Sequence, residues 1–148
     1  MTEFRGAWSE EEIESFLHET TIPIRIATRR SDGSLWPVTV WYRYRDGYFE
    51  CATQARADLV AILRNDPGVG FDVSTNDVPY RGIRGSGVAT VSRDGGRDVL
   101  RELVQRYLGG TESSLARYLL SDDRDEVRIR IDPREIYSWD YTERMRGV

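Results

Sequence analysis

The sequence predicts a mainly β fold with short α-helices, in which six antiparallel strands form a closed or split barrel. Short runs rich in β-branched and aromatic residues follow one another, and glycine-containing turns separate many of them. Many short strands in series favour a barrel over an open sheet. The length of 148 residues suits one domain. We expect a single domain over 1–148, with an N-terminal helix within 1–20 and the barrel with helical insertions in 21–141.

The N-terminal segment predicts a helix that begins after Ser9. Ser9 suits the N-cap position, and Glu12 stands three residues later, where it can complete a capping box. Ile13, Phe16 and Leu17 then recur with helical spacing and form one apolar face.

Three strands are expected next, in residues 24–28, 36–44 and 48–53. Turns in residues 31–34 and 45–47 separate them, and both turns contain an Asp-Gly pair. Asp-Gly between β-favouring runs is a strong signal for a hairpin. The pattern therefore predicts a three-stranded antiparallel meander.

The second half of the chain is expected to mix strands with short helices. The expected helices are 54–65, 97–108 and 112–120, and the expected strands are 69–73, 83–92 and 126–131, the last continuing in 136–141. Two glycines within a predicted strand, Gly85 and Gly87, indicate a bulge, a bend or a close approach to a ligand. Period-2 patterns predict a buried core that includes Val38, Val40, Val69, Phe71, Val127, Ile129 and Ile131.

The charge pattern limits the ligands that the protein can hold. The net charge is -4, which argues against general nucleic-acid binding. All 21 basic residues are arginine, so an anion must be held by arginine, backbone N–H groups or hydroxyls. The N-terminal residues lack an apolar signal core, and no stretch approaches the ~20 apolar residues of a membrane span. A cytoplasmic location is the expectation.

Side chains for acid–base or metal chemistry are scarce. His18 is the single histidine, Cys51 is the single cysteine, and we expect both to be structural. The sequence has no zinc motif, P-loop or dinucleotide-binding glycine motif, so no metal site is expected and no catalytic residue can be named. Two classes remain: a binding module, or an enzyme whose organic cofactor supplies the reactivity.

Three segments in a fixed order resemble a known superfamily. They are 24–42, 49–67 and 79–85, the last reading PYRGIRG. Over residues 20–141 their order and spacing resemble the pyridoxamine 5'-phosphate oxidase-like superfamily of FMN-binding split barrels. The PYRGIRG stretch and the closing residues 138–141 look most like the flavin/deazaflavin-dependent oxidoreductases.

The resemblance implies a six-stranded antiparallel split barrel that forms a homodimer, with a cofactor in each of two grooves between the subunits. It implies FMN, or alternatively 8-hydroxy-5-deazaflavin coenzyme F-420, and hydride transfer between that cofactor and a small organic substrate. One alternative is a non-catalytic protein that binds a flavin, a deazaflavin or haem. Pyridoxamine 5'-phosphate oxidation is less favoured, because the chain is short and its C-terminal end has arginine without histidine.

The resemblance also implies positions for the cofactor. They are Pro37, Val38, Thr39, Val40 and Trp41 beside the ring, Thr53, Gln54 and Arg56 at the phosphate, and Arg81, Arg84 and Trp139 nearby, the two arginines reaching the cofactor of the other subunit. Simpler interpretations stay open: Trp41 as core packing, and the arginines as solvated side chains. Where many relatives have lysine or arginine in the following helix, this chain has Asp58 or Leu59, which weakens the case for tight FMN binding.

Overall fold

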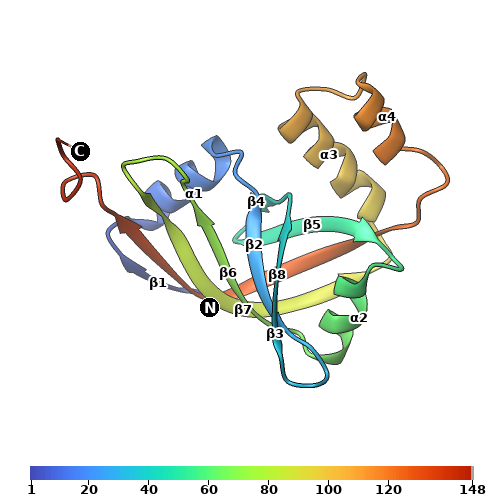
Figure 1. Ribbon diagram of the computed structural model, residues 1–148, viewed down its shortest axis with the longest axis horizontal. Helices are drawn as coiled ribbons and strands as arrows, with labels where there is room; N and C mark the ends of the chain where they lie inside the picture. The colour runs from blue at the N-terminus through green and yellow to red at the C-terminus, as the bar shows by residue number, and fades with distance from the viewer. Residues whose placement is uncertain (148) are drawn as a thin grey trace.

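A strongly curved sheet organises the part of the chain that the computed structural model describes, residues 1–147. Within this range there are eight strands and four helices (Figure 1). The strands are β1 (Glu3–Gly6), β2 (Ile24–Arg29), β3 (Leu35–Val40), β4 (Arg43–Arg45), β5 (Tyr48–Gln54), β6 (Gly68–Ser74), β7 (Arg81–Ser92) and β8 (Glu126–Asp140). The helices are α1 (Glu10–Glu19), α2 (Asp58–Asn65), α3 (Gly96–Leu108) and α4 (Ser114–Leu119).

The two ends of the sheet are β3 and β4, which are consecutive in the chain. Hydrogen-bonded neighbours follow the order β3-β2-β6-β7-β8-β5-β4 with antiparallel pairing, and β1 pairs with β8 in parallel. Only residues 41–42 separate β3 from β4, so the sheet curves until its two ends meet at this connection. The arrangement is that of a split barrel, whose ladder stays open between the two end strands.

The connection at Trp41 and Tyr42 differs from the expectation. The strand predicted for 36–44 is broken there, and the predicted meander is wrong, because the hairpins β2–β3 and β4–β5 lie at opposite ends of the sheet. This break and the unexpected β1 give eight strands within residues 1–147 instead of six. The physical cause is tertiary: the Tyr42 side chain is fully buried, and its hydroxyl donates to the Leu17 carbonyl at 2.9 Å.

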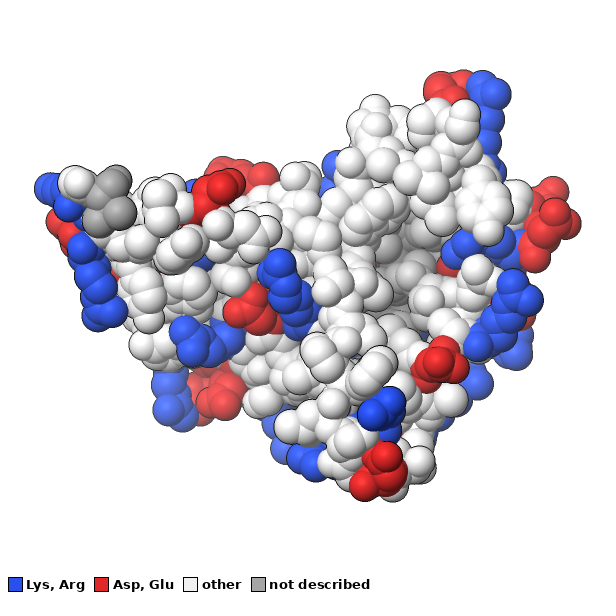
Figure 2. Space-filling view, in the orientation of Figure 1, with Lys and Arg blue, Asp and Glu red and all other residues white. Residues whose placement is uncertain are grey.

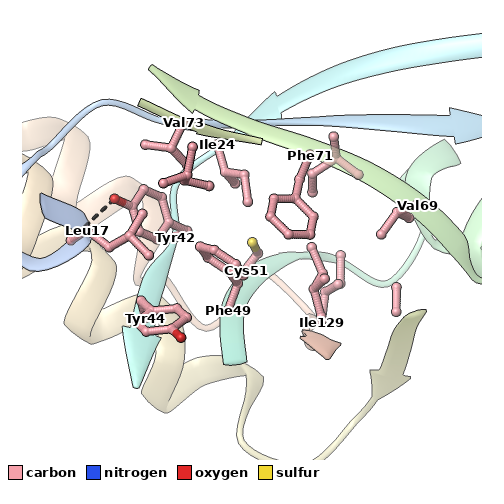
Figure 3. Packing of buried hydrophobic residues seen from close by; sticks show 14 of the residues in the cluster. Leu17, Ile24, Tyr42, Tyr44, Phe49, Cys51, Val69, Phe71, Val73 and Ile129 are labelled. Carbon is pink, nitrogen blue, oxygen red and sulfur yellow. Dashed lines mark hydrogen bonds between the residues drawn. The ribbon is translucent and has the colours of Figure 1, made fainter. Parts of the chain in front are cut away.

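The core fills the inside of the curved sheet and is rich in aromatic rings (Figure 3). The ring of Phe49 lies 5.0 Å from that of Phe71 and 4.9 Å from that of Tyr44, measured between centroids. Burial confirms five of the predicted core residues: Val69, Phe71, Val127, Ile129 and Ile131. Val38 and Val40 pack against this core but are only partly buried, because β3 is an end strand with one ladder neighbour.

Helix α1 has the predicted start and the predicted apolar face. The Ser9 hydroxyl accepts from the Glu12 amide at 3.1 Å, and the Glu12 carboxylate accepts from the Ser9 amide at 3.0 Å. Ile13, Phe16 and Leu17, which form the apolar face, are buried. The capping box therefore fixes where α1 begins, and the apolar face fixes how it docks.

We expect Ser9→Ala to lower the free energy of unfolding by about 0.5–2 kcal/mol, the usual cost of a lost N-cap. Ser15→Ala is the matched control, because Ser15 is exposed within the same helix and alanine is the better helix former. Urea denaturation of both variants measures the difference. Equal stability of the two variants would contradict the capping role of Ser9.

The glycines of β7 explain why its backbone approaches β8 so closely. The register of the β7–β8 pair shifts between Ser86 and Gly87, so a bulge, one of the three alternatives that the glycines indicated, is present. A Cβ atom on Gly85 would lie 2.1 Å from the Glu135 carbonyl oxygen and 2.6 Å from the Phe71 ring. Only glycine fits there, because the backbone of β8 and a core ring occupy the space on that side.

The helices after β5 position the candidate site. Helix α2 starts at Asp58, later than predicted, because Gln54 still belongs to β5 and residues 55–57 form a turn. The Ala55 amide in this turn donates to the Asp125 carbonyl at 2.8 Å. Helices α3 and α4 lie together on one side of the molecule beyond β5 (Figure 1). Within residues 1–147, no helix is both long enough and apolar enough to span a bilayer.

The single cysteine and the single histidine of the chain both have structural roles. Cys51 is fully buried, and burial raises the pKa of its thiol to about 12, so it stays protonated at neutral pH. The His18 ring Nε2 lies 2.8 Å from the Tyr44 carbonyl oxygen. Neither side chain lies on the candidate site described below.

A buried carboxylate, Glu50, is held among arginines on β4 and β8. Its side chain is 2% exposed, and its oxygens lie 2.7 Å from Arg43 Nε and 2.6 Å from Arg128 Nε. Arg43 also pairs with Glu102 of α3. Burial alone would raise the pKa of Glu50, but the hydrogen bond and charge of Arg43, with the charge of Arg128, lower it below its ordinary value of 4.5. This cluster joins β4, β5, β8 and α3.

Candidate functional site

A cavity of about 350 Å³ lies between the ends of β3 and β5 on one side and helices α3 and α4 on the other. We call it the strand–helix pocket. Figure 2 shows the surface hollowed beneath the α3–α4 pair, with mostly uncharged residues around the hollow. Its lining residues are Thr39, Val40, Trp41, Ala52 and Thr53 from the strand side, and Leu100, Leu103, Leu115, Leu119 and Arg124 from the helix side.

Trp41 forms a fixed wall of the strand–helix pocket. Its ring stacks on Tyr107 of α3, with centroids 5.0 Å apart and planes at 5°. The Tyr107 hydroxyl donates to the Ile22 carbonyl at 3.2 Å and accepts from the Tyr42 amide at 3.4 Å. Burial raises the pKa of Tyr107, which keeps this hydroxyl neutral. Trp41 therefore lines the pocket and also packs against a small second core of Leu100, Val104 and Ala116.

The predicted phosphate residues lie at the end of β5 and in the turn that follows. Thr53 lines the pocket, Gln54 is half-buried as the last residue of β5, and Arg56 is exposed in the turn. Arg56 makes no ion pair with any carboxylate of residues 1–147. Ala57 is the N-cap of α2 and has no side chain that could cap the first N–H groups.

The turn after β5 has groups that favour the binding of an anion and one group that opposes it. The uncapped amides and the positive end of the α2 dipole favour a negative group, and Arg56 adds a free guanidinium. Asp58 in the first turn opposes it, as its position in the sequence indicated. Arginine, threonine and amides are the donors that a phosphate needs in a chain without lysine.

The other predicted residues lie in different grooves. A larger cavity, of about 610 Å³, covers the outer face of β2, β6, β7 and β8, and Pro37 and Arg84 are part of its lining. The Arg84 guanidinium lies 5.4 Å from the Trp139 ring centroid and 5.7 Å from that of Tyr137. Arg81 lies elsewhere, in a surface hollow beside α1. Each of these three cavities contains only some of the predicted residues.

Trp139 has an unusual environment. Its indole Nε1 is buried and has no hydrogen-bond partner among the described residues. A buried indole N–H normally finds an acceptor. The buried Trp139 indole therefore has an unused donor inside the protein, while its ring lies next to Arg84, which lines the 610 Å³ cavity.

Sequence reasoning missed the helical wall of the strand–helix pocket. Leu100, Leu103, Leu115 and Leu119 come from two helices whose leucines signal only an apolar face in the sequence. Arg124 closes the pocket, and its Nε lies 2.6 Å from a Glu126 oxygen. Within residues 1–147, no three His, Cys, Asp or Glu side chains gather as metal ligands would.

Comparison with known proteins gives the fold. No protein-family model and no curated protein sequence matches the chain. A conserved hypothetical protein from Mycobacterium tuberculosis is similar, with 27% identity and a TM-score of 0.76 over 91% of this chain and 86% of that one. An F420 reductase matches with 22% identity and a TM-score of 0.71, over 86% of this chain and 98% of its own.

A candidate pyridoxamine 5'-phosphate oxidase from Listeria innocua matches with 14% identity and a TM-score of 0.66, over 87% of this chain and 96% of its own. The chain therefore shares the fold of the pyridoxamine 5'-phosphate oxidase-like split-barrel proteins. The fold expected from the sequence motifs is confirmed at this level, whereas the number of strands differs as described above.

Proposed function

We propose that this chain is an oxidoreductase that uses a flavin-type cofactor, FMN or the deazaflavin coenzyme F-420. The observation that carries the proposal is that Thr39, Val40, Trp41 and Thr53 meet in one pocket, directly before a helix start with uncapped amides and the free Arg56. A solved F420 reductase has the same fold. A cofactor enzyme needs few reactive side chains, in agreement with the scarcity of acid–base groups here.

The chain's own residues would bind and orient the cofactor. Arg56, the Thr53 hydroxyl and the first amides of α2 would hold its phosphate, and the edge of β3 up to Trp41 would lie along its ring. The stacked Trp41–Tyr107 pair gives that ring a fixed apolar boundary and excludes water on one side. When bound, the reduced cofactor would supply the hydride that passes to a small organic substrate.

We also propose that the functional unit is a homodimer. The 610 Å³ groove on the outer face of β2, β6, β7 and β8, which Arg84 lines, is separate from the strand–helix pocket within one chain. The hairpin end of β3 exposes apolar side chains, with Leu35 65% and Trp36 45% exposed. A second subunit related by a two-fold axis would cover these faces. It would place its own Arg84 groove beside the cofactor of the first subunit. Light scattering at micromolar concentration tests this, and a monomeric mass would contradict it.

The sharpest test of the phosphate position is Arg56→Ala. A charge-assisted hydrogen bond contributes about 1.5–3 kcal/mol, so we expect FMN affinity to fall roughly ten- to a hundred-fold. Riboflavin has no phosphate, so its affinity should hardly change. Isothermal titration of both ligands, and of coenzyme F-420, gives the comparison.

Arg64→Ala is the matched control for this test. Arg64 is exposed at the opposite end of the same helix α2, in its last turn. Its loss should leave both affinities unchanged. If Arg56→Ala bound FMN as tightly as the parent does, the anion would have to be held elsewhere, with Arg81 and Arg84 the next candidates.

The absorbance spectrum of the purified protein separates the cofactor classes. A flavin spectrum or a deazaflavin band would support the proposal, and a haem Soret band would contradict it. Bound flavin that no reductant or substrate can turn over would favour a carrier protein over an oxidoreductase. The spectrum therefore tests the choice of ligand before any assay of activity.

A further inference from the structure

The strand–helix pocket carries almost no charge. Within residues 1–147 Arg124 is the single ionised side chain of its lining. The Arg124 side chain is 15% exposed, and its guanidinium pairs with Glu126, whose side chain is 2% exposed. The positive charge is therefore already matched inside the protein, and the pocket offers no free cation to an anionic ligand.

The helix side of the pocket is an apolar wall at a fixed position. Leu100 and Leu103 come from α3, and Leu115 and Leu119 come from α4. Helix α4 is anchored by Ala116, which is fully buried between the helices. These leucines face the strand side of the pocket, where Thr39 and Thr53 contribute the hydroxyls.

Helix α4 is also tied at both ends. The Ser113 hydroxyl accepts from the Ala116 amide at 3.1 Å and caps the N-terminus. The guanidinium of Arg97 donates to the Leu120 carbonyl and, at 3.3 Å, to the Ser121 carbonyl. Leu115 is nevertheless 50% exposed, so it stands at the rim of the pocket. A rigid helix that presents a leucine at a cavity rim is suited to contact a ligand rather than to pack internally.

We propose that the strand–helix pocket binds a neutral, apolar, ring-sized organic substrate, and that Leu115 and Leu119 of α4 determine this specificity. The assignment of this ligand as a substrate rests on the proposed function. In that function the cofactor ring would lie along β3 and would leave the leucine side of the pocket free. A charged substrate is disfavoured, since it would lose its hydration without gaining a partner. A cavity of about 350 Å³ is within the size range of small-molecule sites.

Two fluorescent probes with the same ring framework test the proposal directly. N-phenyl-1-naphthylamine is neutral, and 1-anilinonaphthalene-8-sulfonate carries a sulfonate. We expect the neutral probe to bind one site per chain, at least tenfold more tightly than the anionic probe. Equal affinities, or tighter binding of the anionic probe, would overturn the proposal.

The variant Leu115→Asp places a charge at the rim and should weaken the neutral probe at least tenfold. Val78→Asp is the matched control, because Val78 is 49% exposed in a loop away from the pocket, and it should leave the affinity unchanged. Leu115→Met should retain binding, and circular dichroism shows that each variant is folded. Unchanged binding by Leu115→Asp would overturn the proposal.

The same probe separates this inference from the proposed function. Probe binding that persists when FMN or coenzyme F-420 is bound supports a substrate site on the leucine side of the pocket, which stays open beside the cofactor. Probe binding in a chain that binds neither cofactor supports the apolar pocket and contradicts only the oxidoreductase proposal. Competitive displacement of the probe by either cofactor would assign the pocket to the cofactor and overturn the inference.

Discussion

Ile129→Ala is expected to lower the free energy of unfolding by about 2–5 kcal/mol, the range for a truncated core isoleucine. Ile129 is fully buried, and β8 lies between β5 and β7 in the ladder. It pairs with Cys51 on one side and Val91 on the other. Truncation leaves a cavity that these neighbours cannot fill, because both are held in register by the sheet.

A graded pair of variants makes this test specific to packing. Ile129→Val removes one methylene group and should cost about 0.5–1.5 kcal/mol. Urea denaturation of the parent, Ile129→Val and Ile129→Ala should therefore give an ordered series with similar m values. A loss below about 2 kcal/mol for Ile129→Ala would show that β8 is not the central strand of this core.

The strand pattern reports which face of a strand is apolar, but it does not report what covers that face. Val38 and Val40 follow the same alternation as Val127 and Ile129. Val127 and Ile129 are fully buried, whereas Val38 and Val40 are only partly buried. The difference is the position in the ladder: β8 is central and β3 is at an end. The position of a strand in a sheet is set by the whole topology, so alternation alone could not predict it.

The break after β3 has a similar explanation. Residues 36–44 form one continuous run that favours a strand, and nothing local marks the interruption. The contacts that produce the break join residues far apart in the sequence. The Tyr42 hydroxyl donates a hydrogen bond to the carbonyl of Leu17, 25 positions earlier, and Trp41 stacks on Tyr107 of α3. The local signals therefore predicted both hairpins correctly but joined them into one meander, whereas the structure places them at opposite ends of the sheet.

The candidate site could be predicted only in part. The motif resemblance identified Thr39, Val40, Trp41 and Thr53, which the structure brings into one pocket. The opposite wall comes from α3 and α4, whose leucines have the spacing of any amphipathic helix. Which apolar face lines a pocket depends on how the helices dock, and that information is not local.

The second large effect on the free energy of unfolding is expected when the buried carboxylate of Glu50 is replaced. Glu50→Gln keeps the shape of the side chain but removes the charge that Arg43 and Arg128 neutralise. We expect the free energy of unfolding at neutral pH to fall by about 2–4 kcal/mol, somewhat less than for a fully buried pair, because both arginines keep some contact with water. Glu143→Gln, which removes an 80% exposed ion-pair partner, is the control and should change stability little.

The effect of Glu50 should also depend on pH. Because the folded protein lowers the pKa of Glu50 below 4.5, its ionised form contributes stability that is fully present above that value. This contribution is lost as the pH falls through the lowered pKa, since the carboxyl is then protonated in both states. The stability difference between the parent and Glu50→Gln should therefore be constant from neutral pH down to about pH 5 and should shrink as the pH falls below 4.5. A difference that stayed constant over the whole range would mean that shape and hydrogen bonding, not the charge of Glu50, hold β4, β5, β8 and α3 together.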